Sequence, residues 1–266
     1  MSLVINHNMM AANTARNLNE HYAALGKSTQ RLSSGLRVNS AADDAAGLAI
    51  RELQRADITT LHQGARNAND AISMIQTADG ALGIIDEKLT RMKELAEQAA
   101  TGTYDSTQRL MIESEYQAMA SEITRIATAT DFNVIHLLNG TLSSDTHNGS
   151  GMTSTGKLKV HFGTGNDSAE DYYYITIGCS TASSLGVGNQ ALDDTGALRA
   201  GGTVSTQEAA QKSLEAITLA IVSKDKIRAH LGAMQNRLEN TITNLNTQAE
   251  NLQAAESRIS DVDVAT

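Results

Sequence analysis

The sequence contains no proline and no tryptophan, and only 3% of its 266 residues are aromatic. Proline costs about 3 kcal/mol inside a helix, so a chain without it is free to form very long helices. Aromatic side chains bury the most area per residue and dominate compact cores. The apolar content here is Ala, Leu, Ile and Met instead. This composition favours long packed helices over a compact globular core.

The single cysteine, Cys179, excludes an internal disulfide and a zinc site built from cysteines. No run of about 18 apolar residues occurs, so we expect no membrane insertion. The N-terminus lacks the basic start, apolar run and cleavage site of a secretory signal, so any export must proceed without signal cleavage. A net charge of −9 argues against nucleic acid as a partner.

Apolar residues repeat every seven positions over long stretches, the spacing that keeps one face of a helix toward a partner helix. In the first stretch, about residues 8–32, they are Leu18, Leu25 and Leu32. The second stretch, about residues 42–99, would be roughly 80–90 Å long as a helix. Its row consists of Leu61, Ala68, Ile75, Leu82, Leu89 and Ala96. The row of the last stretch, about residues 206–259, consists of Ile217, Leu231, Leu238, Leu245, Leu252 and Ile259.

Shorter features lie between these stretches. Residues 32–47 predict an irregular connector, with Ser40 or Asp43 capping the next helix. Residues 107–128 predict a further helix, capped by Asp105 or Ser106. Apolar and polar side chains alternate in residues 157–162, and residues 172–177 are mostly β-branched or aromatic. A turn-forming link joins the two segments, so together they predict a β-hairpin. The predicted fold is mostly α: an elongated rod of long antiparallel helices in coiled-coil-like packing, with a small β-hairpin region.

Candidate chemical sites are weak. Asp167, Glu170 and Asp171 lack the spacing of a calcium loop, so a solvated turn is the better interpretation. The adjacent pairs Asp43–Asp44 and Asp193–Asp194 point in different directions if helical, which argues against shared acid–base chemistry. We therefore predict no catalytic, cofactor or metal site, and no enzyme.

Four segments together resemble one family, the bacterial flagellins. They are RLSSGLRVNSAADDAAGLAI (Arg31–Ile50), ARNANDAISMIQTADGALGII (Ala65–Ile85), LTRMKELAEQA (Leu89–Ala99) and the run from Leu231 to Thr266 that begins LGAMQNRLENT. The resemblance implies a structural subunit of the extracellular flagellar filament. It also implies other flagellin subunits, the type III export apparatus and the filament cap as partners. The alternative is a hook–filament junction protein, which shares the terminal helical pattern but fits LTRMKELAEQA less well.

The resemblance also divides the chain. Residues 1–41 would be a filament-core helix and connector, with Leu18, Leu25 and Leu32 on its packing face. Residues 42–130 and 206–266 would form the two halves of an inner rod domain. They would pack through Leu61, Ile75, Leu82, Leu231, Leu238, Leu245 and Leu252. Residues 131–205 would be a short variable region.

Two departures from the family pattern carry expectations. Flagellins usually continue past SRISDVDVAT into a helix that pairs with the first one, so the first helix here would lack its partner and assembly would be defective. Flagellins commonly have Asn-Gly where this chain has Asn133–Val134. Because valine resists a positive φ, we expect a different turn there.

A receptor surface is implied as well. Arg91, Leu95 and Glu115 stand where flagellins recognised by Toll-like receptor 5 carry their contact residues, in and near the segment from Leu89 to Ala96. Arg91 and Leu95 are four residues apart and share a helix face. The competing interpretation is that Arg91 pairs with a nearby glutamate and that Leu95 packs between helices.

Overall fold

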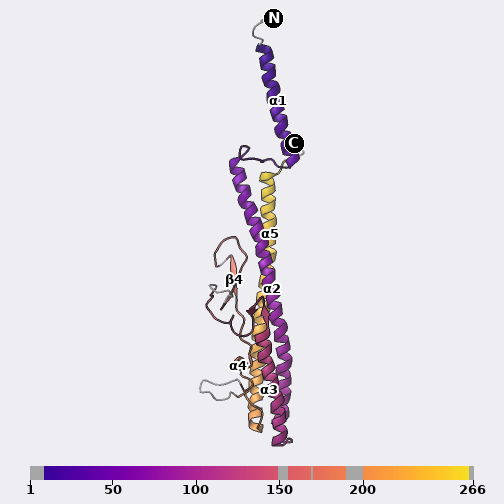
Figure 1. Cartoon of the computed structure of the whole chain (residues 1–266), viewed down its shortest axis with the longest axis vertical. Helices are drawn as coiled ribbons and strands as arrows, with labels where there is room; N and C mark the ends of the chain where they lie inside the picture. Colours follow the sequence, from indigo (N-terminus) through magenta and orange to yellow (C-terminus); the bar gives the residue numbers. More distant parts are fainter. Residues whose placement is uncertain (1–8, 149–154, 169, 190–199, 264–266) are drawn as a thin grey trace. The chain divides into compact units, whose positions relative to one another are not determined.

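The computed structural model describes residues 9–148, 155–168, 170–189 and 200–263 (Figure 1). The chain forms two compact units. Unit 1 contains the residues up to His62 and those from Leu245 onward, and unit 2 contains Gln63–Asn244. The helices are α1 (Met9–Ser34), α2 (Ala45–Ala100), α3 (Ser106–Ala129), α4 (Ala182–Leu185) and α5 (Gln207–Ser260). The strands are β1 (Asp131–Phe132), β2 (Ile135–His136), β3 (Leu158–His161) and β4 (Tyr172–Ile175).

The predicted class is confirmed: the fold is mostly α, with long helices and small antiparallel strand pairs. Strand β3 pairs with β4 in the register Leu158↔Ile175 to His161↔Tyr172, so the predicted hairpin is present. The second strand pair, β1–β2, was not predicted. Among the described residues, no helix carries an apolar stretch long enough to cross a membrane.

The core of unit 2 is built by α2, α3 and α5, which lie side by side in Figure 1. Ile75 and Leu82 of α2 and Leu231 and Leu238 of α5 belong to one buried cluster. The predicted heptad rows therefore meet in this unit, with α3 adding a third apolar stripe. Of the seven predicted packing residues, six are buried, namely Leu61, Ile75, Leu82, Leu231, Leu238 and Leu245. Leu252 is half-buried.

Two ion-pair groups show that α2 and α5 run antiparallel in unit 2. Arg228 Nε lies 2.7 Å from Asp79 Oδ1. Farther along α2, Lys224 Nζ lies 2.6 Å from Asp86 Oδ1 and 2.7 Å from Asp225 Oδ1. The side chain of Lys224, the polar residue in the row of α5, is only 2% exposed. Between Ile217 and Leu231, the seven-residue row of α5 is therefore interrupted by a buried ammonium group that contacts two carboxylates.

The β3–β4 hairpin approaches α2 at Gly64. A Cβ atom on this glycine would lie within about 2 Å of the Phe162 carbonyl oxygen, a distance that only glycine permits. The side chain of Asn67, one turn along α2, donates a 2.9 Å hydrogen bond to the His161 carbonyl. The absence of a side chain at Gly64 therefore lets the strand backbone rest directly on the helix.

Gly64→Ala is expected to destabilise unit 2 by about 1–3 kcal/mol, because the hairpin must move away from α2. The same substitution at Gly80, also within α2, meets no atom within 4 Å. Gly80→Ala is therefore expected to stabilise the helix by about 0.5–1 kcal/mol, as in an exposed helix interior. Urea denaturation followed by circular dichroism would measure both effects. If both variants changed the free energy of unfolding in the same direction, the close approach of Phe162 to Gly64 would be contradicted.

The turn between β1 and β2 corrects an expectation. Asn133 and Val134 have φ angles of 50° and 69°, so both adopt the left-handed conformation. Two-residue links between antiparallel strands favour type I′ and II′ turns, and the type I′ turn has positive φ at both central positions. The pairs Asp131↔His136 and Phe132↔Ile135 impose this geometry. Valine therefore keeps the turn expected of Asn-Gly, at a cost of about 1–2 kcal/mol.

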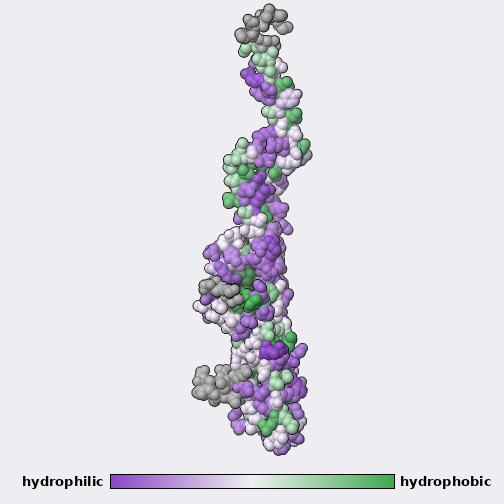
Figure 2. Space-filling view, viewed as in Figure 1, coloured by the Kyte–Doolittle hydropathy of each residue, from purple (hydrophilic) through white to green (hydrophobic). Residues whose placement is uncertain are grey.

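In unit 1, the side chains of α1 remain exposed along the helix. Leu18, Leu25 and Leu32 are 53%, 61% and 63% exposed, and hydrophobic residues are visible on the surface of α1 in Figure 2. Helix α2 begins with a cap that differs from both predicted residues. Asp44 Oδ1 accepts a 2.9 Å hydrogen bond from the Gly47 amide, whereas Ser40 and Asp43 bond to each other.

Candidate interaction site

The predicted receptor residue Arg91 lies on α2 and bridges to α3. Its Nη2 and Nε atoms lie 2.7 Å and 2.9 Å from Glu115 Oε1, and Nη1 lies 3.0 Å from Glu94 Oε2. The hydrogen bonds that Arg91 donates to Glu115 and then to Glu94 raise the pKa of Arg91 above its usual value. The Arg91 and Glu115 side chains are 48% and 44% exposed. A solvent-accessible charge pair therefore joins the two helices.

The two leucines predicted beside this pair are not on the surface. Leu89 is fully buried and Leu95 is 1% exposed, because both belong to the α2 stripe covered by α3 and α5. The structure thus brings Arg91 and Glu115 together and leaves Leu89 and Leu95 in the core beneath them. Burial of Leu89 agrees with its place in the heptad row, and burial of Leu95 agrees with the competing interpretation that it packs between helices.

A second polar group, which sequence reasoning missed, lies on α3 in unit 2. The Tyr116 hydroxyl donates a 2.7 Å hydrogen bond to the Gly201 carbonyl, and burial raises the pKa of this hydroxyl. Gln117 donates to the Gly202 carbonyl at 2.7 Å and accepts from the Asn189 amide at 2.8 Å. Gly188 and Gly201 are also joined by a 2.9 Å backbone hydrogen bond. Helix α3 therefore forms hydrogen bonds with Asn189 and with Gly201 and Gly202, all in the region predicted to be variable.

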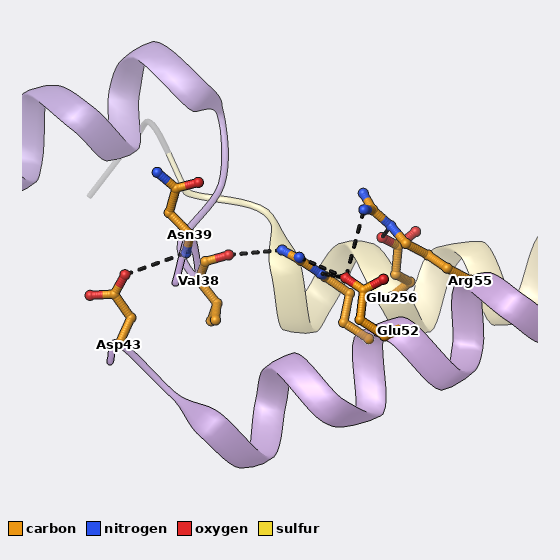
Figure 3. Close-up of polar contacts among 7 residues, drawn as sticks. Val38, Asn39, Asp43, Glu52, Arg55 and Glu256 are labelled. Atoms are coloured by element: carbon orange, nitrogen blue, oxygen red, sulfur yellow. Dashed lines mark hydrogen bonds and ion pairs between the residues drawn. The ribbon is translucent and has the colours of Figure 1, made fainter. Parts of the chain in front are cut away.

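In unit 1, a polar cluster fixes the connector between α1 and α2 (Figure 3). The buried Arg51 donates from Nη1 to the Val38 carbonyl at 2.8 Å. One helical turn later, Arg55 Nε lies 2.8 Å from Glu256 Oε1 of α5. Directly before Val38, Arg37 donates from its backbone and side chain to the carbonyls of Ser260 and Ile259. The predicted irregular connector is therefore tied to α2 and to the end of α5.

Asp43 joins the same connector to α1. Its Oδ1 atom lies 2.6 Å from Lys27 Nζ, and its Oδ2 atom accepts a 3.4 Å hydrogen bond from the Asn39 amide. The hydrogen bond from Lys27 is the main cause that lowers the pKa of Asp43 from 3.8 to about 2. A carboxyl group whose folded pKa is lowered stabilises the folded state above its unfolded pKa and loses that effect as the pH falls.

The connector contact is therefore expected to be intact above pH 3.8 and to weaken as the pH falls through about 2. The chemical shift of the Asn39 amide, followed by NMR in an acid titration, would report the loss. Asp43→Asn should remove this titration and leave a flat curve. Asp57→Asn alters an exposed carboxylate elsewhere on α2 and should leave the Asn39 titration unchanged. A titrating Asn39 amide in Asp43→Asn would contradict the assignment.

The hairpin loop uses Asp171 for its own structure. The Asp171 carboxylate accepts hydrogen bonds from the amides of Gly165 and Asp167, which lowers its pKa. Within the described ranges, no group of three His, Cys, Asp or Glu side chains is arranged to hold a metal ion. Asp193 and Asp194 lie outside the described residues.

Comparison with known proteins identifies both ends of the chain. Residues 5–143 match the bacterial flagellin N-terminal helical region, and residues 214–266 match the bacterial flagellin C-terminal helical region. A flagellar filament 33 kDa core protein from Treponema phagedenis is 39% identical over 99% of this chain and 88% of its own length. A flagellin from Halalkalibacterium halodurans is 40% identical over 99% of this chain and 87% of its own length.

Solved structures agree with these matches. The crystal structure of Bacillus cereus flagellin has a TM-score of 0.50 and 27% identity, covering 72% of this chain and 94% of that one. A flagellar hook-associated protein from Vibrio parahaemolyticus, with a TM-score of 0.62 and 16% identity, covers 82% of this chain and 100% of that one, and shares the fold. The chain therefore belongs to the bacterial flagellin family and is a structural subunit of the flagellar filament.

Proposed function

We propose that this chain is exported through the flagellar type III apparatus without signal cleavage and assembles with other copies beneath the filament cap, outside the cell. The observation that supports this most strongly is the similarity to filament core proteins over 99% of the chain. In this proposal, residues 1–41 form a filament-core segment, and residues 42–130 and 206–266 form the inner rod domain. Residues 131–205 form a reduced variable region.

Expression in a motile bacterium that lacks its own flagellin would test the proposal. Assembly predicts filaments in electron micrographs, decorated along their whole length by an antibody to this chain, whereas the defective assembly expected from an unpartnered first helix predicts exported chain without filaments. Decoration restricted to the base of the filament would favour the alternative, a hook–filament junction protein. The absence of the chain from the culture medium and from the cell surface would contradict export.

We further infer that the free subunit activates Toll-like receptor 5 through Arg91 and Glu115. The support is the position of these residues in the flagellin pattern and the exposed geometry of the pair. A planar guanidinium that is already oriented by a carboxylate loses little freedom on binding, which suits an interface anchor. Leu89 and Leu95 contribute by packing beneath the pair and not by direct contact.

Arg91→Ala is expected to raise the concentration needed for half-maximal activation of receptor-expressing cells at least about tenfold, as for an interface residue worth about 1.4 kcal/mol or more. Arg125→Ala is the matched control, because Arg125 is exposed on α3 and pairs with Glu122 of the same helix. Circular dichroism should be unchanged in both variants. Equal potency of Arg91→Ala and Arg125→Ala would reject the assignment.

A further inference from the structure

A hollow of about 500 Å³ lies on the surface of unit 2 between β4 and α5. Its lining consists of Tyr173, Ala233, Asn236, Arg237, Asn240, Thr241 and Asn244. The three asparagines are spaced four residues apart, so they follow one face of α5. None of the lining residues is acidic, although the chain carries 30 acidic and 21 basic residues. The hollow is therefore a polar site that has one positive charge and no negative charge.

The positive charge belongs to Arg237, which is held by an aromatic side chain. Its Cζ atom lies 3.6 Å from the centre of the Tyr173 ring. The Tyr173 ring in turn packs against Phe162, with 4.7 Å between the ring centres. The side chains of Thr241 and then Arg237 lower the pKa of Tyr173. Attraction to the ring face favours this orientation of the guanidinium before any ligand arrives.

Arg237 lacks the carboxylate partner that three other arginines of unit 2 have. Arg91, Arg125 and Arg228 each form an ion pair with a carboxylate. No ion pair of Arg237 occurs in the described part of the chain, where its contacts are with Tyr173. A guanidinium presents its N–H groups in a planar fork that matches a carboxylate with two parallel hydrogen bonds. The site thus lacks the partner that its chemistry fits best.

The neighbouring amides add donors to the same site. Asn240 uses its amide nitrogen to bond the Asn236 carbonyl at 2.9 Å, which fixes the Asn240 side chain along the helix. The side chains of Asn236 and Asn244 line the hollow on either side of it. Amide N–H groups beside a guanidinium can satisfy the remaining lone pairs of a bound carboxylate.

We propose that this hollow is a carboxylate-binding site that takes an acidic side chain from a second copy of the chain. The inference rests on the proposed assembly of copies. Charge complementarity selects this occupant: each copy has a net charge of −9 and so offers many surface carboxylates, while the hollow offers an oriented cation with no acidic neighbour in its lining. Electrostatic pairing of this type sets the orientation and register of an interface more than its total affinity.

Zero-length crosslinking tests the proposal and identifies the acidic residue. Arg237→Lys keeps the positive charge and supplies an amine that a carbodiimide can join to a carboxylate in contact with it. The protein is crosslinked at concentrations where copies associate, and linked peptides from a mixture of isotopically light and heavy chains are identified by mass spectrometry. We expect light–heavy links from position 237 at several times the yield of the control. Arg125→Lys is that control, because its partner Glu122 lies in the same chain.

Two results would overturn the proposal: links from position 237 only to carboxylates of the same chain, or a light–heavy yield equal to that of Arg125→Lys. Binding of inorganic phosphate to the wild type, lost in Arg237→Gln, without light–heavy links would show a site for free anions instead. Sedimentation velocity of the wild type separates a failure of this site from a failure of assembly. Association without links at position 237 would reject this site alone, and a monomer at every concentration would reject both this site and assembly.

Discussion

Leu238→Ala is expected to lower the free energy of unfolding of unit 2 by about 3–5 kcal/mol, measured by urea denaturation. Leu238 is fully buried in the cluster that joins α2, α3 and α5. Truncation removes apolar area and leaves a cavity that three helices cannot easily close, because each is fixed by its own row of contacts. The effect should appear as a lower denaturation midpoint with little change in slope.

Leu219→Ala is the matched control for this prediction. Leu219 lies on the same helix, but it is 64% exposed. Its truncation is expected to change the stability by no more than about 0.5 kcal/mol. A loss below about 1 kcal/mol for Leu238→Ala would mean that the α5 row is not the packing surface it is in the structure.

The second large effect is expected at Lys224. Replacing both of its partners, in Asp86→Asn with Asp225→Asn, removes the two carboxylates that contact the buried ammonium group and should cost about 3–5 kcal/mol. Either substitution alone should cost less, because one carboxylate remains 2.6–2.7 Å from Nζ. The loss arises from the unpaired charge and not from a missing attraction, so it should disappear when the charge is removed.

Lys224→Met provides the decisive comparison. Methionine retains most of the apolar stem of lysine, and replacing a buried ion pair by apolar groups is often neutral or stabilising. The triple variant with Lys224→Met, Asp86→Asn and Asp225→Asn should therefore recover most of the stability lost by the double variant. Equal instability of the double and triple variants, measured by thermal and urea denaturation, would place the cost elsewhere.

Much of the helical architecture could be predicted because long periodic rows give a strong signal. The row through Ile75 and Leu82 and the row through Leu231 and Leu238 predicted both helices and their contact. Local signals were weaker where several residues compete for one role. Ser40, Asp43 and Asp44 all precede α2, and only the structure shows that Asp44 is its cap.

Features that depend on long-range contacts were not predictable in the same way. The left-handed Val134 is imposed by the pairing of β1 with β2 and runs against its own preference. The sequence pattern places Tyr116 in the apolar stripe of α3, yet its hydroxyl donates to the Gly201 carbonyl, 85 residues away in sequence. The candidate receptor pair Arg91–Glu115 was predictable only through resemblance, because residues 24 positions apart give no periodic signal.

The hydrogen bonds that join Asn189 and Gly202 to Gln117, and Gly188 to Gly201, have a practical consequence. Residues 188–189 and 201–202 are already held together by these bonds. A foreign peptide inserted between Asn189 and Ala200 would therefore not have to supply the free energy that brings these residues together. Each doubling of the inserted length should then cost only about 0.6 kcal/mol in closure entropy. The position is suited to antigen display, with many copies of a grafted epitope carried on one polymer.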